Sequence, residues 1–430
     1  MRILIATPFL PWPLHEGGRV AQFRTLVALQ GACEFTLLFP AYYAEQDTDV
    51  FELKRQLSKV NFVPVRCYDP PMPPPPRPRL TLRRAVVNIL RKIFPAPKVH
   101  FEKTAELDLN SIKGDPEPLP YYPFHNLHPD FVKAVDTELD NGYDIFQAEF
   151  CEMLSLGPIV GDRAKKLFIH HQLHFIYAER LLKSLLKTTT QARYLAERMR
   201  LEEKAFLECF DTAVVFSNID ADLLRGLCPA LGVEVSPFPS PEDIALHPPI
   251  GGCEGHDFVF VASESHKPNA MGLAWFMEAV WPKLKANLPT ANIIVVGKWS
   301  QSAQASIPAF QDICFQGFVP DLSTALCGKI MVVPLWVGSG IRTKILAAWS
   351  AGVPVVTTTI GAEGLPGENG KHYWVADNAD SFAAACEELA GHARMRCEFV
   401  KNGLDIVERH YSLEAVKNRR LEIYKNLLSK

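Results

Sequence analysis

Short apolar runs that favour β-strands alternate with helical patterns along most of the chain. Strands separated by helices pair in parallel through crossover connections, so this alternation predicts doubly wound parallel sheets. In the first half we expect strands at residues 2–6, 35–39, 61–65, 144–148, 166–170 and 212–216. In the second half we expect them at 257–262, 292–297, 313–316, 330–333, 354–358 and 372–375. Two such series predict two similar α/β domains.

Length and composition exclude several other classes of protein. A chain of 430 residues is too long for one small module, and 48% hydrophobic with 22% charged residues is typical of a folded globular protein. The 45 basic and 48 acidic residues leave a net charge of −3, which predicts no general attraction for nucleic acid.

The cellular location is predicted from apolar runs and cysteines. No apolar run approaches the roughly 18 to 20 residues of a membrane helix, and the apolar start RILIA is too short for a signal peptide. Ten cysteines lie scattered, without a Cys-x-x-Cys pair, mostly in apolar patterns. We therefore expect a cytoplasmic protein with reduced thiols.

Proline and glycine mark the expected domain boundary. They are dense from Ser236 to about Gly252, where neither a helix nor a central strand can continue. We place a first domain at 1–235, a linker at 236–256 and a second domain at 257–409. Residues 410–430 have the apolar spacing of a terminal helix with one buried face.

Two further helical patterns are interpreted as structural. An apolar stripe from Leu273 to Leu284, after a possible N-cap at Asn269, predicts a core helix. The segment 177–207 carries mixed charges, which is typical of a solvated helix face, and we assign it no function.

Residues 64–127 depart from the α/β alternation. The run PPMPPPPRPRL favours polyproline II or coil, and LTLRRAVVNILRKIF after it has the spacing of an amphipathic helix. Seven basic residues and no acidic one lie between Arg77 and Lys98. One interpretation is a peripheral contact of 77–98 with an anionic surface on the inner face of a membrane. The other is a helix docked on its own domain with a solvated basic edge.

Two glycine-rich loops follow predicted strands and open helices, the arrangement that lets backbone N–H groups bind an anion. The first contains Gly17 and Gly18, and its spacing is not that of a dinucleotide site. The second is Gly338-Ser339-Gly340, before a helix expected to begin near Ile341.

Arg342 and Lys344 occupy the first turn of that second helix, where positive charge opposes the helix dipole. A diphosphate bound by the glycine-rich amides and by both cations would explain them. The alternative is an ordinary strand-to-helix turn with two exposed bases.

Several motifs occur in the order of a known family. They are the Gly-Gly loop, FVFVASESHKPNAMGLAWFMEAVWPKL, ANIIVVGKW, FQGFVPDLSTAL and VVPLWVGSGIRTKILAAWSAGVPVVTTTIGAEGL. This order resembles retaining glycosyltransferases of family 4, of the exopolysaccharide type. The resemblance is specific over 257–391 and looser, but collinear, over 1–230. It implies the GT-B fold: two Rossmann-like doubly wound domains that face a cleft, with the terminal helix crossing back to the first domain.

The resemblance also implies roles for single residues. The second domain would bind a nucleotide-sugar donor, and the first domain would bind the acceptor. The donor diphosphate would be held by Gly17, Gly18, Lys267, Gly338, Ser339, Gly340, Arg342 and Lys344. The nucleotide would be flanked by Gly317, Phe318, Val319 and Asp321. The family's two glutamates, which have seven residues between them, are replaced by Ser339 and Ala347. Because the second of them normally binds the ribose, Glu363 is a candidate substitute.

Candidates for catalysis stand at the ends of two predicted strands of the first domain. His170 and His171 follow one strand and Glu149 follows the other, at the sheet edge where ligands gather. The resemblance implies that a histidine here supports the leaving group or the sugar. A structural histidine pair is the alternative. The spacing does not suit metal ligands, so neither a metal nor another cofactor is expected.

Together these features predict transfer of a sugar from a nucleotide-diphosphate donor to a saccharide or lipid-linked acceptor, with retention at the anomeric carbon, in the synthesis of cell-surface polysaccharide or glycoconjugate. A non-catalytic GT-B partner protein, which Ala347 favours, is one alternative. A GT-B nucleotide-sugar epimerase or phosphorylase is another, and a pure membrane-binding scaffold is a third. The large insertion argues against the second, and the Gly-Ser-Gly loop against the third.

Overall fold

The computed structural model describes residues 1–14, 17–42, 46–67, 123–184, 189–241, 257–308, 312–319 and 321–429. Most of the proline-rich segment 64–127, including the basic stretch 77–98, therefore lies outside the described residues, as do residues 242–256 of the expected linker. No helix in the described ranges is long and apolar enough to cross a membrane.

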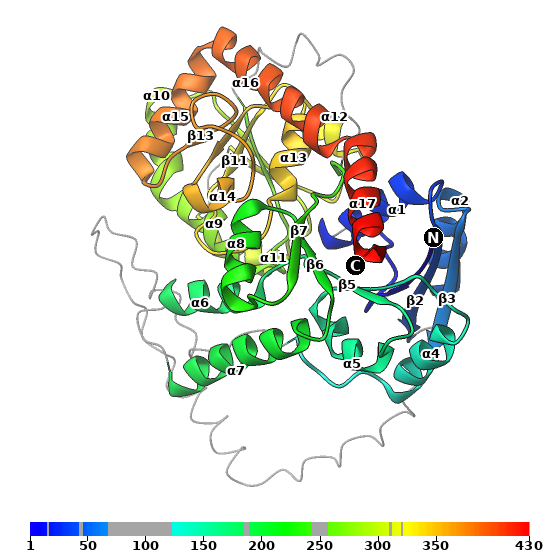
Figure 1. Cartoon of the computed structure of the whole chain (residues 1–430). Coiled ribbons are helices and arrows are strands. Elements are labelled where there is room, and N and C mark those ends of the chain that lie inside the picture. The colour runs from blue at the N-terminus through cyan, green and yellow to red at the C-terminus, as the bar shows by residue number, and fades with distance from the viewer. Residues whose placement is uncertain are drawn as a thin grey trace.

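A seven-stranded parallel sheet forms the first domain, with strand order β3-β2-β1-β4-β5-β6-β7 (Figure 1). Its strands are β1 (Arg2–Ala6), β2 (Glu34–Ala41), β3 (Val60–Arg66), β4 (Ile145–Glu149), β5 (Lys165–Ile169), β6 (Thr212–Val215) and β7 (Gly232–Val235). Its helices are α1 (Gly17–Leu29), α2 (Gln46–Gln56), α4 (Pro129–Leu139), η1 (Cys151–Leu156), α5 (Gly157–Val160), α6 (His174–Ser184), α7 (Thr190–Leu207) and α8 (Asn218–Leu227).

A six-stranded parallel sheet forms the second domain, with order β10-β9-β8-β11-β12-β13. Its strands are β8 (Phe258–Val261), β9 (Ile293–Val296), β10 (Ile313–Gly317), β11 (Ile330–Val333), β12 (Val355–Thr357) and β13 (Trp374–Val375). Its helices are α9 (Lys267–Trp275), η3 (Phe276–Val280), α10 (Trp281–Asn287), α11 (Gln301–Ser306), α12 (Leu322–Leu326), α13 (Thr343–Ser350), α14 (Thr359–Ala362), α15 (Ala379–Gly391) and α16 (Ala393–Ile406).

The central strands are apolar on both faces, as expected for parallel sheets covered by helices. In β4, Ile145 belongs to the core beneath α1, whereas Phe146 and Ala148 belong to the core on the opposite face. Two polar residues, Gln147 and Glu149, continue the Ile145 side of the strand although both are buried. The first sheet thus carries a buried polar strip on an otherwise apolar face.

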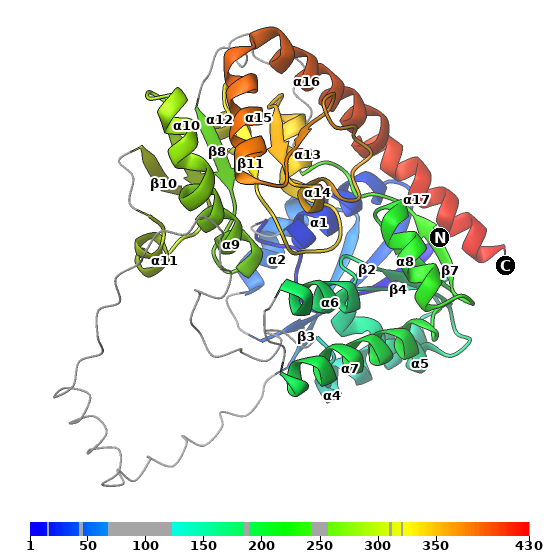
Figure 2. The same cartoon turned by 90° about the vertical axis from the view of Figure 1, so that its left-hand side faces the viewer.

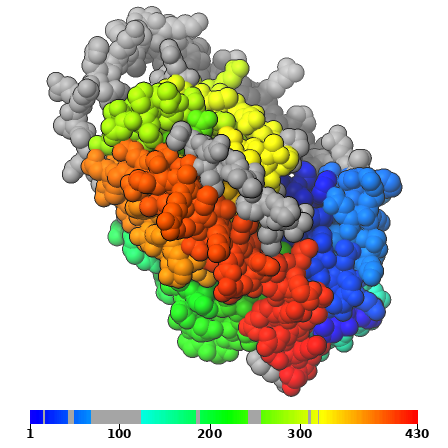
Figure 3. All heavy atoms as spheres, turned by 90° about the horizontal axis from the view of Figure 1, so that it is seen from above, coloured from blue at the N-terminus to red at the C-terminus, as the bar shows by residue number. Residues whose placement is uncertain are grey.

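The final helices join the two domains. After α16, the π-helical turn η4 (Val407–Tyr411) leads into α17 (Leu413–Leu428), and Figure 2 shows these elements as one nearly continuous run. The last helix packs along α1 of the first domain, and Figure 3 shows the two in contact at the surface. Residues of α13, η4, α17 and α1 consequently share one hydrophobic core that extends through both domains.

Most expected strands are present within one or two residues of their predicted ends, and the parallel doubly wound class is confirmed. Three local expectations were wrong. The strand β7 was missed. The second domain's first helix is capped by His266, not Asn269, because Pro268 already lies within its first turn. The segment 177–207 is split into α6 and α7.

Candidate active site at the domain interface

The candidate residues gather where the carboxyl ends of the two sheets face each other. In the first sheet β1, β4 and β5 are neighbours, so the loop before Gly17 and the residues after Glu149 and His170 share one edge. In the second sheet β8, β11 and β12 are neighbours, which brings together the segments that hold Lys267, Arg342 and Glu363. Parallel strands therefore place both sets of loops toward the interface.

The two glycine-rich loops contact the opposite domain. A Cβ on Gly17 would lie 3.0 Å from Oγ1 of Thr343, the first residue of α13. A Cβ on Gly340 would lie 3.0 Å from the carbonyl oxygen of His171, and Gly340 has a φ of +75° that disfavours other residues. The Ser339 hydroxyl donates a hydrogen bond to the carbonyl oxygen of Leu173 over 3.1 Å. The N-terminus of α13 is thus enclosed by the first domain.

Arg180 of α6 strengthens this contact. Its guanidinium donates to the carbonyl oxygen of Gly338 over 2.6 Å and forms an ion pair with Glu363 over 2.9 Å. Both partners belong to the second domain, and the side chains are 24% and 15% exposed. The interpretation of this segment as only a solvated face is therefore wrong at Arg180. Glu363, the candidate ribose acceptor, has its carboxylate at the interface, already paired with a cation.

Arg342 stabilises the Gly-Ser-Gly loop from inside. The helix begins at Thr343, two residues later than expected, and Arg342 is its N-cap residue. The buried guanidinium donates to the carbonyl oxygens of Ser339 and Gly340, both over 2.7 Å, and to that of Ile360 over 3.2 Å. Its Nε is buried and has no hydrogen-bond partner among the residues that the structure describes. Burial lowers the pKa of Arg342 to about 10, despite the nearby charge of Glu363.

Lys344 extends from α13 toward the start of α9. Its ammonium donates to Oδ1 of Asn269 over 2.9 Å and lies 5.4 Å from the ring centroid of Phe260. Burial, and then the charge of Arg342, lower the pKa of Lys344 to about 7. Burial is the largest cause that lowers the pKa of His266 to about 4, and the charges of Lys344 and Arg342 add to it. Within the described residues, neither Arg342 nor Lys344 forms an ion pair with a carboxylate.

His171 is held by three neighbours at the end of β5. Its Nε2 lies 3.1 Å from a carboxylate oxygen of Glu149, and its ring stacks on Phe150 with centroids 3.9 Å apart and planes 11° apart. The Phe216 ring meets it edge to face at 5.2 Å. Phe150 has a φ of 69°, an unfavourable backbone conformation for a non-glycine residue, of a kind that gathers at functional sites. The Nδ1 side of His171 faces Gly18, where a Cβ would lie 3.8 Å from it.

His170 has a different environment from its neighbour. Its Nε2 lies 2.8 Å from a carboxylate oxygen of Glu203, and both side chains are almost fully buried. The same carboxylate accepts backbone N–H groups of His174 and Phe175 at the start of α6, over 3.1 and 2.8 Å. Glu203 therefore caps α6 and pairs with His170, which gives His170 a clear structural role.

The remaining candidates lie on the second domain. Lys267 is the exposed first residue of α9. The expected nucleotide segment starts at Gly317, the last residue of the edge strand β10, which has a φ of +76°. Phe318 is 52% exposed, and Val319 packs on the core. Asp321 caps α12 by accepting the N–H of Thr324. Ala347 is 2% exposed on α13.

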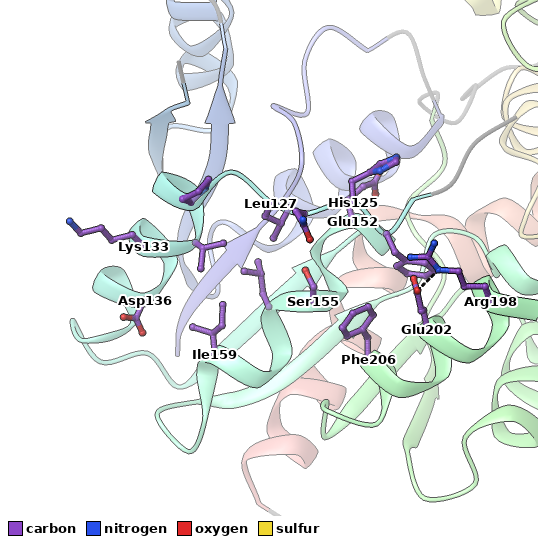
Figure 4. Close-up of a pocket in the computed structure, with 15 residues that line it drawn as sticks. His125, Leu127, Lys133, Asp136, Glu152, Ser155, Ile159, Arg198, Glu202 and Phe206 are labelled. Carbon is purple, nitrogen blue, oxygen red and sulfur yellow. Dashed lines mark hydrogen bonds and ion pairs between the residues drawn. The ribbon is translucent and has the colours of Figure 1, made fainter. Parts of the chain in front are cut away.

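A pocket of about 860 Å³ lies in the first domain between α4, η1 and α7 (Figure 4). Apolar side chains such as Leu127, Ile159 and Phe206 form part of its wall, and the ion pair of Arg198 with Glu202 lies beside them. It also includes Glu152, three residues beyond Glu149 in the chain. Within the described ranges no group of three His, Cys, Asp or Glu side chains could hold a metal ion.

Comparison with known proteins agrees with this geometry. Residues 255–392 match the model of a family described as glycosyl transferases group 1. These residues include both cations, the Gly-Ser-Gly loop and Glu363. The second domain is therefore similar to the group 1 glycosyl transferases. No curated protein sequence matches the chain.

Solved structures share the architecture over the whole chain. HepE of Anabaena, in complex with UDP and glucose, is 12% identical with a TM-score of 0.64, and the match covers 99% of each chain. Sucrose-phosphate synthase from Thermosynechococcus elongatus is 14% identical with a TM-score of 0.67, over 100% of this chain and 99% of that one. TarM is 10% identical with a TM-score of 0.67, over 100% and 99%. The molecule has the GT-B fold.

Sequence reasoning missed three residues that complete the site. Arg180 was concealed by its mixed-charge helix, and Asn269 was interpreted as a cap. Gln147 lies in a strand predicted only as apolar. The sequence does contain a signal for Gln147, because a polar residue in the middle of a strand that is buried on both faces requires a hydrogen-bond partner.

Proposed function

We propose that the protein transfers a sugar from a nucleotide-diphosphate donor to a saccharide or lipid-linked acceptor, with retention, in the synthesis of cell-surface polysaccharide or glycoconjugate. The observation that carries this proposal is the pair of cations formed by buried Arg342 and partly buried Lys344, which lack a carboxylate partner in the described structure. They stand at the N-terminus of α13, where the helix dipole is also positive. Such a site favours a bound anion.

The family match and the interface geometry support a diphosphate as that anion. The Gly-Ser-Gly loop directly precedes the helix that carries Lys344, and backbone N–H donors at such a position would stabilise the negative charge of a departing diphosphate without a metal. In the proposed reaction the bond from the anomeric carbon to the phosphate oxygen breaks, and the acceptor oxygen bonds to the same face of the sugar. The acceptor proton goes to the departing phosphate oxygen.

The proposed roles of the first domain follow from the residues that it contributes to the domain interface. His171, held by Glu149, contacts the sugar or the leaving group, and Gly18 allows the donor to approach the start of α1. The acceptor approaches from the first domain, whose pocket between α4 and α7 offers both apolar and hydrogen-bonding groups. HepE and its bound UDP and glucose support a nucleotide sugar as the donor class.

A panel of UDP-, GDP- and ADP-sugars in a thermal-shift assay tests donor binding. A ligand at 100 times its dissociation constant stabilises the folded state by about 2.7 kcal/mol, enough for a clear shift. The effective donor is then incubated with candidate acceptors, and the anomeric configuration of the product is read by NMR. The absence of a shift with every nucleotide sugar would contradict the proposal.

Ala347 favours a second candidate, a non-catalytic GT-B partner. This alanine is 2% exposed at a position where the resemblance implies a ribose-binding glutamate. Donor binding without turnover in the presence of acceptors would favour this candidate, whereas product formation would exclude it.

A further inference from the structure

A chain of hydrogen bonds connects the last helix to His171. The hydroxyl of Tyr424 in α17 donates to Oε1 of Gln147 over 2.7 Å. The amide Nε2 of Gln147 donates to Oε1 of Glu149 over 2.7 Å, and Oε2 of Glu149 lies 3.1 Å from Nε2 of His171. Tyr424, Gln147 and Glu149 are all buried.

The chemistry of the groups fixes the direction of this chain. A carboxylate only accepts hydrogen bonds, so Glu149 requires the N–H side of the Gln147 amide and an N–H at Nε2 of His171. The amide oxygen of Gln147 must then face Tyr424, and it needs a donor there. Within the described residues, the phenol of Tyr424 is that donor. Burial, the largest effect on Tyr424, raises its pKa, and this keeps the donating hydroxyl protonated.

The arrangement determines which ring nitrogen of His171 faces the start of α1. With Nε2–H directed at Glu149, the opposite nitrogen Nδ1 faces Gly18, at the start of α1. Stacking on Phe150 fixes the plane of the ring but does not select which nitrogen carries the proton. That selection comes from Glu149, whose orientation depends on Gln147.

We propose that Tyr424 is a positioning residue for His171, acting through Gln147 and Glu149, so that the C-terminal helix completes the site in the first domain. The part of the inference that concerns catalysis rests on the proposed function, because only there does His171 contact the donor. The relay itself does not depend on the reaction.

The test compares Tyr424→Phe with Tyr411→Phe as a matched control. Both tyrosines are buried near the end of the chain, but Tyr411 has no part in the relay. The readout is the ring ¹⁵N signal of His171 at neutral pH, without ligand, assigned by its loss in His171→Asn. In the wild type and Tyr411→Phe we expect one signal with a slowly exchanging proton on Nε2. In Tyr424→Phe we expect that proton to exchange faster and the tautomer to become mixed.

An unchanged His171 signal in a folded Tyr424→Phe protein overturns the inference. If Tyr424→Phe does not fold, Gln147→Met interrupts the same relay without changing α17 and carries the same expectation. Two further measurements separate the relay from the proposed function. They are calorimetric titration with UDP and the turnover rate with the nucleotide sugar that binds. We expect UDP affinity unchanged and kcat lowered roughly 10- to 100-fold in Tyr424→Phe. Absence of UDP binding by the wild type contradicts the proposed function, but leaves the His171 result to decide the relay.

Discussion

The guanidinium of Arg180 lies 2.9 Å from the carboxylate of Glu363, although the two residues belong to different domains. The same guanidinium donates to Gly338 in the loop before α13. One side chain of the first domain therefore contacts both the predicted diphosphate loop and the segment after β12. Arg180 thus links the packing of the two domains to the conformation of the loop before α13.

We expect this ion pair to show a clear interaction energy because both side chains are mostly buried. A double-mutant cycle of Arg180→Met and Glu363→Gln should give a coupling of roughly 0.5 to 3 kcal/mol in apparent stability. The control is Glu179 with Lys183, exposed residues of the same helix, for which about 0.5 kcal/mol or less is expected. Equal couplings in the two cycles would show that Arg180 does not hold the domains together.

Replacement of Lys344 should weaken donor binding with little effect on folding. Lys344→Met removes a charge-assisted contact with phosphate and should cost about 1.5 to 3 kcal/mol of UDP binding. Lys285→Met is the control, since Lys285 is a partly buried lysine of the same domain that pairs with Asp312. Calorimetric titration with UDP measures both, and equal affinities in the two variants would contradict the assignment.

Arg342 should behave differently from Lys344, because its guanidinium donates to three backbone carbonyl oxygens. Arg342→Met leaves these buried acceptors without donors, so we expect both a lower Tm and weaker UDP binding. Thermal unfolding with and without UDP distinguishes the two effects. A variant with normal Tm and weak binding would show that the guanidinium serves the ligand alone.

The affinity for UDP should fall as pH rises through about 7. Burial and Arg342 lower the pKa of Lys344 to about 7, so its ammonium is largely lost above that pH in the free protein. A diphosphate favours the charged form, and binding above pH 7 should therefore take up a proton. Titrations in buffers of different ionisation enthalpy detect this uptake. In Lys344→Met this contribution to the pH dependence should disappear.

The same shift also affects stability. The folded-state pKa of Lys344 lies below its ordinary value of 10.5, so between about pH 7 and 10.5 the unfolded chain binds more protons than the folded one. Lys344 therefore contributes stability that rises with pH across this window, opposite in sign to the binding effect.

Gly18→Ala should disturb the His171 ring. The new Cβ would lie 2.8 Å from the Phe150 ring, which stacks on His171, so the stack must shift. We expect lower turnover with the fold retained. Gly31→Ala is the control, since a Cβ there meets nothing within 4 Å. Similar kinetic constants for both variants would contradict the importance of the stack.

Sequence patterns were sufficient for most of the fold because strands such as β1, β8 and β11 are short apolar runs bounded by helices. The glycine-rich loops and Glu149 lie at the domain interface and beside His171, respectively, but their binding and catalytic roles stay predictions. Sequence patterns failed where a role depends on a partner far away in the chain. Arg180 has an ordinary mixed-charge context until Glu363 is placed opposite it. Gln147 acquires its role only when Tyr424 reaches β4, and no local periodicity encodes that meeting.

The hydrophobic core that runs from α13 through η4 to α17 and α1 has a consequence for biosynthesis. During translation the first sheet emerges long before α17, which is encoded after both sheets. Until then the surface of α1 and the polar strip of β4 lack their covering helix, and the nascent first domain exposes apolar area. The first domain is therefore translated first but completed last. A nascent chain on a ribosome that stalls before α17 would need a chaperone.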